Sequence, residues 1–209
     1  MKITEINKQK TYYEVRTELA VYEIDGEFLR KYRLEEGHDA QEELLEELHD
    51  KSRFRRAYKR ACYLLDARDY SYSLMYQKLM ATYHDRELCH RVLTQLVQCG
   101  AIDDRRYAAR LAEYLVERKR YGLYRVRQEM LRRGLDKSLI EEQLEAFSET
   151  AEDQIGQVLE KKYGRYLTDP DDLKARQKVI AGMARLGYSY GSVKAAIEDY
   201  FADFEEDEE

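Results

Sequence analysis

The sequence is short of the residues that interrupt or cross-link regular structure. Its 209 residues include one proline, ten glycines, three cysteines and no tryptophan. Because sandwiches and barrels need many turns, the shortage of proline and glycine argues against an all-β fold. Three cysteines without paired spacing argue against a disulfide scaffold and favour a reducing compartment.

Long hydrophobic runs are also missing. No stretch approaches the ~20 apolar residues that a membrane-spanning helix needs. The first residues, Met1–Glu5, are not followed by the apolar run of a secretory signal. We therefore expect a cytoplasmic protein that does not bind membranes. A hydrophobic content of 44% is enough for a core, so general disorder is not expected.

The net charge of −6 conceals an uneven distribution along the chain. Residues 1–50 hold 7 basic and 14 acidic side chains, residues 51–137 hold 21 and 10, and residues 138–209 hold 8 and 18. A basic middle between acidic ends indicates a surface that faces a polyanion. The last residues, 205–209, are all acidic, and we expect a disordered tail there.

The first 50 residues are predicted to form a β extension that ends in an acidic linker helix. Tyr13 and Val15 alternate with charged residues, as in a half-buried strand. Asp25 and Gly26 lie between two apolar runs, which predicts a hairpin turn because such turns need positive φ. Since an isolated hairpin is marginally stable, we expect a small sheet packed on another element.

From residue 53 onward the hydrophobic pattern is helical. The short segments that end one helix and begin the next recur along the chain. The triplet at 134–136 (GLD) returns at 187–189 (GYS) and has a counterpart at 83–85 (YHD). In each, one helix ends, a polar residue caps the next helix, and the residue before the cap packs on the residue four after it. The expected caps are Asp85, Asp103, Asp136 and Ser189.

This repeat has a period of about 50 residues, which leaves room for three helices. We place the three units at 53–102, 103–148 and 149–204. The predicted fold class is mainly α. Three tandem three-helix repeats should stack as an elongated, curved array, preceded by the small N-terminal β-hairpin extension.

A basic segment is the best candidate for a binding surface. On the predicted helix 123–133, Val126 and Met130 face the core, while Arg125 and Arg132 share the opposite face. Arginine suits either a nucleic-acid backbone or acidic protein loops, and the alternative is a solvated helix face. The expected binding residues are Arg118, Lys119, Arg120, Tyr121, Arg125, Arg127, Arg132 and Arg133, with Arg55, Arg56 and Lys59 from a second basic cluster.

The nineteen tyrosines do not by themselves indicate base stacking. Five of them fall on predicted core or staple positions, and only Tyr121 is a candidate for stacking on a base. These five are Tyr63, Tyr107, Tyr114, Tyr188 and Tyr200.

Catalytic and metal-binding patterns are not found. The sequence has no Gly-x-Ser-x-Gly motif, Walker loop or other glycine-rich phosphate cradle, so we expect no enzyme activity and no cofactor. The pair Asp103-Asp104 is explained by a helix cap and a first-turn acid. The histidines and cysteines between 84 and 99 match no zinc-ligand spacing, and no metal is expected.

Several motifs resemble the RecX family of bacterial regulatory proteins, in their order and spacing. They are Gly100–Ala108 (GAIDDRRYA), Arg133–Leu135 (RGL), Leu186–Tyr190 (LGYSY) and, in the extension, Tyr22–Gly37. The resemblance implies three tandem three-helix repeats and no catalysis. It also implies that the protein restrains the RecA recombinase by binding the RecA–single-stranded DNA filament, with effects on recombination, DNA repair and the SOS response.

The expected partner is therefore the RecA filament, bound by a monomer, and the sequence leaves open whether single-stranded DNA is contacted directly. The alternative is a helical-repeat scaffold that binds another acidic protein without nucleic acid.

Overall fold

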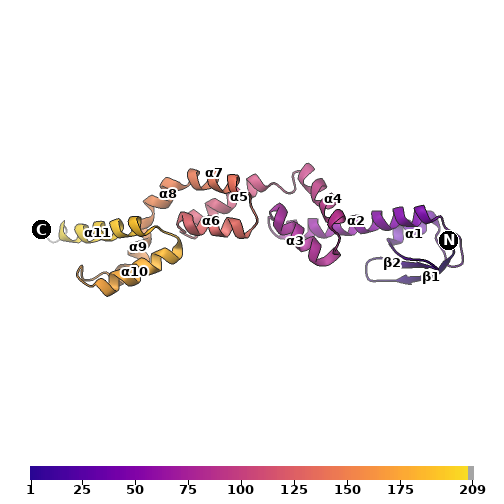
Figure 1. Cartoon of the computed structure of the whole chain (residues 1–209), viewed down its shortest axis with the longest axis horizontal. Helices are drawn as coiled ribbons and strands as arrows, with labels where there is room; N and C mark the ends of the chain where they lie inside the picture. Colours follow the sequence, from indigo (N-terminus) through magenta and orange to yellow (C-terminus); the bar gives the residue numbers. More distant parts are fainter. Residues whose placement is uncertain (207–209) are drawn as a thin grey trace. The chain divides into compact units, whose positions relative to one another are not determined.

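The computed structural model describes the backbone of residues 1–206 and the side chains up to residue 202. The protein is mainly helical with one small sheet, as the sequence predicted (Figure 1). It divides into two units, one formed by Met1–Tyr70 with Met75–Ile102, the other by Ser71–Leu74 with Asp103–Glu209. The disordered acidic tail predicted at 205–209 is wrong for residues 205–206, which end the last helix, and residues 207–209 lie outside the described part of the chain. The elongated, curved arrangement stays a prediction.

The N-terminal extension is a three-stranded antiparallel sheet in the order β1 (Ile3–Lys8), β2 (Tyr13–Thr17), β3 (Val21–Ile24). One face of this sheet is apolar and fully buried, through Ile3, Val15 and Ile24. It packs on Leu45 and Leu48 of helix α2 (Glu42–Ala67). The helix therefore supplies the partner that a small sheet needs for stability.

The hairpin turn predicted at Asp25-Gly26 is wrong. The chain leaves β3 and enters helix α1 (Gly26–Tyr32), with the Asp25 carbonyl accepting hydrogen bonds from the amides of Phe28 and Leu29. A Cβ on Gly26 would lie 2.8 Å from a ring carbon of Tyr13, so a larger residue here would require the Tyr13 side chain to shift. An Asp-Gly pair after a strand can therefore precede a helix as well as a hairpin turn.

Helix α2 runs without interruption for 26 residues. The predicted boundary between the extension and the first repeat, at 50–53, falls inside it. The first half of α2 covers the sheet, and the second half buries Ala57 and Ala61 where α2 contacts α4 (Arg86–Gln98). Helix α3 (Tyr72–Tyr83) lies between α2 and α4 in the sequence and completes the predicted first repeat.

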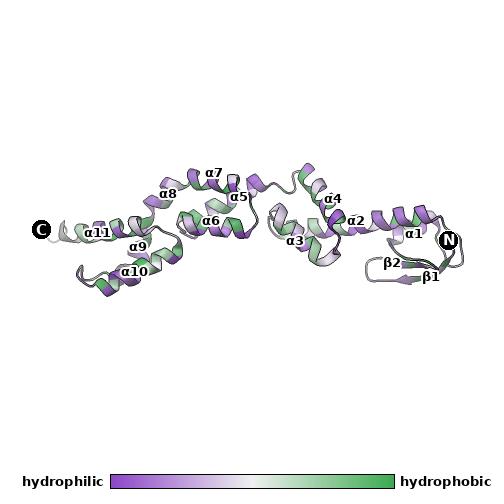
Figure 2. Ribbon diagram, viewed as in Figure 1, coloured by the Kyte–Doolittle hydropathy of each residue, from purple (hydrophilic) through white to green (hydrophobic). Residues whose placement is uncertain are grey.

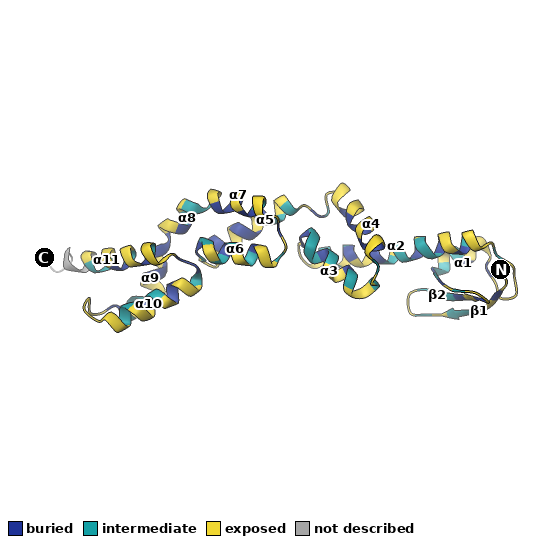
Figure 3. Ribbon diagram, viewed as in Figure 1, coloured by how far each residue is buried: buried dark blue, intermediate teal, exposed yellow. Residues whose placement is uncertain are grey.

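The second unit holds the other two predicted repeats, each with its own apolar core. Val126, Met130 and Ile140 are buried in the first core, and Leu159 and Met183 in the second. Figures 2 and 3 show hydrophobic, buried residues on one side of these helices and hydrophilic, exposed residues on the other. The elements are α5 (Asp104–Glu113), the π-helical turn η1 (Tyr114–Arg118), α6 (Leu123–Arg132), α7 (Lys137–Ala146), α8 (Ser148–Asp153), α9 (Ile155–Tyr163), the 3₁₀ turn η2 (Gly164–Tyr166), α10 (Leu173–Leu186) and α11 (Tyr190–Glu206). No helix in the described part of the chain is both long and apolar enough to cross a membrane.

The four residues expected to cap helices accept hydrogen bonds from backbone amides two or three residues ahead. Asp85 accepts from Leu88 at 3.0 Å, Asp103 from Arg106 at 3.0 Å, Asp136 from Ser138 at 2.8 Å and Ser189 from Ser192 at 3.0 Å. Each bond satisfies a donor that the first helical turn leaves free.

The residues beside these caps differ between repeats. The pair Leu135 and Ile140 is buried, as a hydrophobic staple requires. In the first repeat the corresponding residue, His84, is exposed and takes a left-handed φ of 50°. His84 thus ends the preceding helix, a role that Gly134 has in the second repeat, and it forms no staple with Cys89.

Two of the tyrosines predicted for core positions are exposed. Tyr63 is 72% exposed and Tyr114 is 47% exposed. Each follows a buried alanine, Ala61 or Ala112, by two residues. Two positions along an α-helix correspond to about 200°, which turns a side chain to the opposite face. The other three, Tyr107, Tyr188 and Tyr200, pack against the two cores.

Two glycines bring the second and third repeats into backbone contact. The Gly122 amide donates to the Leu186 carbonyl at 2.9 Å. A Cβ on Gly122 would lie 2.4 Å from the carbonyl carbon and oxygen of Gly187, which itself has a left-handed φ of 95°. No other residue type fits at this junction without moving the two backbones apart.

We expect Gly122→Ala to lower the free energy of unfolding by about 1–3 kcal/mol, because the added methyl group meets backbone atoms that cannot rotate away. The matched control is Gly156→Ala, whose Cβ would meet nothing within 4 Å. The control should leave stability unchanged or raise it by up to about 1 kcal/mol, since alanine favours the helix. Urea denaturation followed by circular dichroism measures both, and equal effects would contradict the contact.

Candidate partner-binding surface

The basic segment lies at the turn between η1 and α6. The chain reverses at Arg120, which has a left-handed φ of 54°. The turn is closed by a hydrogen bond from the Tyr121 amide to the Leu115 carbonyl at 3.0 Å. Helix α6 then buries Val126 and Met130 completely, which turns the arginines between them away from the core.

Four of the predicted cations cluster at this turn and have no carboxylate partner within the described part of the chain: Arg118, Lys119, Arg120 and Arg125. The first three are exposed. The Lys119 ammonium lies 5.4 Å from the ring centre of Tyr114, and its hydrogen bond with that hydroxyl raises the pKa of Lys119. Their positive charge is therefore available to an incoming anion.

The arginines of this turn are oriented by neutral groups. The Arg125 guanidinium stacks 4.0 Å from the ring centre of Tyr121 and donates to the Arg185 carbonyl at 2.8 Å. Arg120 donates to the side-chain oxygen of Gln154 at 2.8 Å. Partners without charge hold a guanidinium in place and leave its charge uncompensated. The sequence did not indicate the Arg185 carbonyl or Gln154 as partners, since both lie in the third repeat.

The other three predicted cations of the segment are paired with glutamates. Arg127 binds Glu141 of α7 through two bonds, of 2.5 and 2.8 Å. Arg132 and Arg133 share Glu129, at 3.1 and 2.7 Å, and the bond from Arg133 lowers the pKa of that carboxyl. The Arg132 side chain is nevertheless 72% exposed. These three residues therefore offer less free charge than the turn.

The second predicted cluster, in the first unit, is compensated in a way that the sequence did not reveal. Arg56 is 13% exposed and lies between Asp25, at 2.9 Å, and Glu23, at 2.5 Å. Arg55 is paired with an acid of α1 at 2.5 Å. Arg56 thus joins the sheet to α2 and has little surface left for a partner. Lys59 is exposed and has no ion pair among the described residues.

A buried tyrosine supports the basic turn from the third repeat. The Tyr188 hydroxyl donates to the Arg120 carbonyl at 3.0 Å. Tyr188 is only 7% exposed, and this burial raises its pKa to about 12. The left-handed residue at the turn is therefore held by a neutral hydroxyl at physiological pH.

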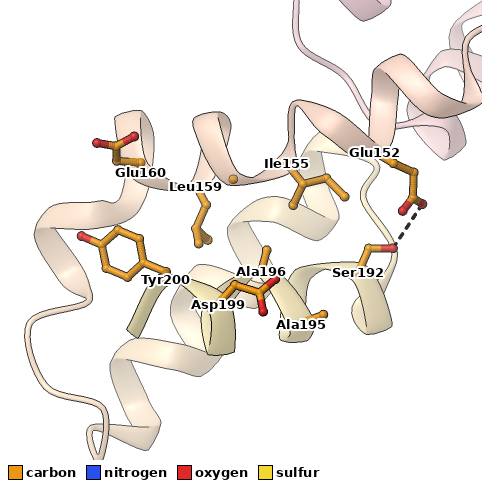
Figure 4. A pocket seen from close by; sticks show the side chains of 10 residues that line it. Glu152, Ile155, Leu159, Glu160, Ser192, Ala195, Ala196, Asp199 and Tyr200 are labelled. Atoms are coloured by element: carbon orange, nitrogen blue, oxygen red, sulfur yellow. Dashed lines mark hydrogen bonds between the residues drawn. The ribbon is translucent and has the colours of Figure 1, made fainter. Parts of the chain in front are cut away.

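The third repeat also contains a groove, of about 570 Å³, between α9 and α11. Figure 4 shows Ile155 and Leu159 facing Ala196 across it, and Ser192 donating to Glu152 at 3.4 Å. Acidic side chains line this groove, and no basic side chain is among the described residues that do so. It does not contribute to the basic surface.

The structure described so far is that of a protein of tandem three-helix domains, with a basic turn carried by the second of them. Among the described residues, no group of histidine, cysteine, aspartate and glutamate is placed to hold a metal ion. Two family models match the chain: the second three-helix domain of RecX at residues 103–144 and the third at 149–197. These two domain matches support the assignment of the chain to the RecX family of regulatory proteins.

Whole-chain comparisons agree with the two domain matches. The chain is 28% identical to the regulatory protein RecX of Streptococcus sanguinis over 213 residues, covering 100% of this chain and 80% of that protein. It is 23% identical to that of Clostridioides difficile, covering 93% of each. A crystal structure of a regulatory protein RecX shares the fold, with a TM-score of 0.67 and 24% identity over 95% of this chain and 98% of the other.

We expect the free energy of unfolding to fall between pH 10 and pH 12, by up to about 1.36 kcal/mol per pH unit from Tyr188 alone. In this range the unfolded tyrosine, with a pKa of 10.0, has lost its proton while the folded one keeps it. Tyr188→Phe removes this contribution. Denaturation at pH 9, 10, 11 and 12 should give a shallower slope for the variant, and parallel slopes would contradict the assignment.

Proposed function

We propose that the protein restrains RecA by binding the RecA–single-stranded DNA filament through the basic turn of its second repeat. The observation that carries the proposal is the group of cations at 118–120 and 125, which lack carboxylate partners, and of which Arg120 and Arg125 are oriented by neutral groups. Assignment to the RecX family supports the choice of partner. We infer that it acts in the cytoplasm as a monomer and without catalysis.

The physical basis is attraction between a fixed positive surface and a polyanion. A guanidinium pairs with phosphate or carboxylate through two parallel bonds, and it does so more readily when it is already oriented. The Tyr121–Arg125 stack presents such an oriented group beside two freely exposed cations, Arg118 and Lys119. Binding should therefore weaken as salt concentration rises, since salt screens exposed charges.

The paired arginines have a secondary part in this proposal. Arg127 and Arg133 are held by Glu141 and Glu129, so an approaching anion would compete with these carboxylates. Arg132, with its exposed side chain, is the better placed of the three to contact a partner at the edge of the surface.

The test compares two charge reversals in RecA's DNA-dependent ATP hydrolysis and in co-sedimentation with the filament. Arg118→Glu/Lys119→Glu reverses the exposed cations of the turn. Lys161→Glu/Lys162→Glu reverses two neighbouring exposed lysines at the end of α9 and changes the net charge equally. We expect the first variant to need at least about tenfold more protein for half-inhibition, the equivalent of about 1.4 kcal/mol, and the control to stay near the native value.

Equal inhibition by native protein and by the Arg118/Lys119 variant, with circular dichroism unchanged, would remove the basic turn from the interface. Binding of the native chain to an acidic protein in the absence of nucleic acid, with no effect on RecA, would favour the scaffold function instead.

A further inference from the structure

A second charged site lies in the first unit, far along the sequence from the basic turn. It is a pocket of about 760 Å³ whose walls come from four segments. They are the turn before β2, with Thr11 and Tyr12, the segment 23–27 from β3 to the start of α1, the α2 segment 53–60, and the end of α3, with Thr82 and Tyr83. The N-terminal sheet and the first repeat are both needed to enclose it.

The pocket has an excess of positive charge. Five basic side chains line it against three acidic ones. The acids, and Asp85 outside the pocket, pair with Arg53, Arg55 and Arg56. Lys59 remains, with Arg60 beside it, and neither has an ion pair among the described residues. Two exposed cations without ion pairs therefore line the pocket and are accessible to an anion.

Neutral donors complete the lining. Burial raises the pKa of Tyr83, even though the nearby Arg56 and Arg60 lower it, so its hydroxyl keeps its proton at neutral pH. The Arg56 guanidinium lies 4.5 Å from the ring centre of Tyr12, which fixes that ring at the pocket wall. Cations combined with hydroxyl donors are the groups that bind phosphate oxygens in nucleic-acid complexes.

We propose that this pocket binds the phosphodiester backbone of single-stranded nucleic acid, with Lys59 and Arg60 neutralising phosphates and the Tyr83 hydroxyl donating to a phosphate oxygen. A volume of this order is that of a small-molecule site, so it admits a short piece of one strand and not a duplex. The proposal deepens the function proposed above and rests on it only for the nature of the ligand. It gives the N-terminal extension a task, that of supplying one wall of a DNA contact.

The experiment uses the full chain without RecA and measures fluorescence anisotropy of a labelled oligothymidylate at several salt concentrations. Lys59→Ala/Arg60→Ala should weaken binding at least about fivefold at low salt. It should also reduce the slope of log affinity against log salt by about 1.4, since each neutralised phosphate contributes about 0.7. Lys78→Ala/Arg86→Ala is the matched control, because it removes two exposed cations of the same unit outside the pocket.

A third variant, Tyr83→Phe, keeps the ring and removes the hydroxyl, and we expect it to weaken binding about twofold to fivefold with no change in salt slope. Equal loss in the pocket variant and in the control, or native affinity in the pocket variant, overturns the proposal. Since RecA is absent from this assay, either outcome leaves the test of the basic turn unaffected.

Discussion

The approach of Gly122 to Gly187 is the constraint on which the geometry of the second unit depends. Without side chains at these two positions, the backbones of the second and third three-helix domains meet directly. The amide of Gly122 then reaches the last carbonyl of α10, at Leu186. The same approach places Arg125 against the neighbouring carbonyl at 185. A packing requirement between two domains thereby determines where a positive charge is presented.

The basic segment shows why charge along a chain is a poor guide to charge in space. Seven cations between 118 and 133 look like one surface in the sequence. In the folded chain they separate into a group without carboxylate partners among the described residues and a group held by carboxylates. Arg127 belongs to the paired group because helices α6 and α7 form a hairpin, which brings Glu141, 14 positions away in the sequence, to Arg127. The same holds in the first unit. There, β3 and the residue after it bring Glu23 and Asp25 to Arg56, which lies far from them in the sequence.

Local patterns were the predictable part of this structure. Helices, their caps and the repeat period depend on residues within one or two turns of each other, so Asp103 and Asp136 could be assigned their hydrogen bonds from spacing alone. Two errors came from signals with more than one physical cause. Gly26 begins a helix and not a hairpin, and Tyr63 follows a buried stripe without belonging to it.

The parts that escaped prediction involve contacts between segments far apart in the chain. Nothing near Arg120 in the sequence points to Gln154 or to Tyr188, which hold it. The grouping of Lys59 with Tyr83 likewise needs the fold, since it joins two helices across an intervening segment. Sequence reasoning therefore named most of the charged residues of both candidate sites but could not say which of them are free.

The continuity of helix α2 restricts which insertions and deletions the sequence can accept during evolution. A flexible linker absorbs an inserted or deleted residue, whereas a helix turns by about 100° and lengthens by about 1.5 Å for each one. A single insertion between Leu48 and Arg56 would swing the sheet around the helix axis and carry Asp25 away from its arginine. Changes close to a whole number of turns, such as seven or eleven residues, would come near to restoring the orientation. We therefore expect the length of helix α2 to change mainly in steps that keep the sheet on the same side of the helix.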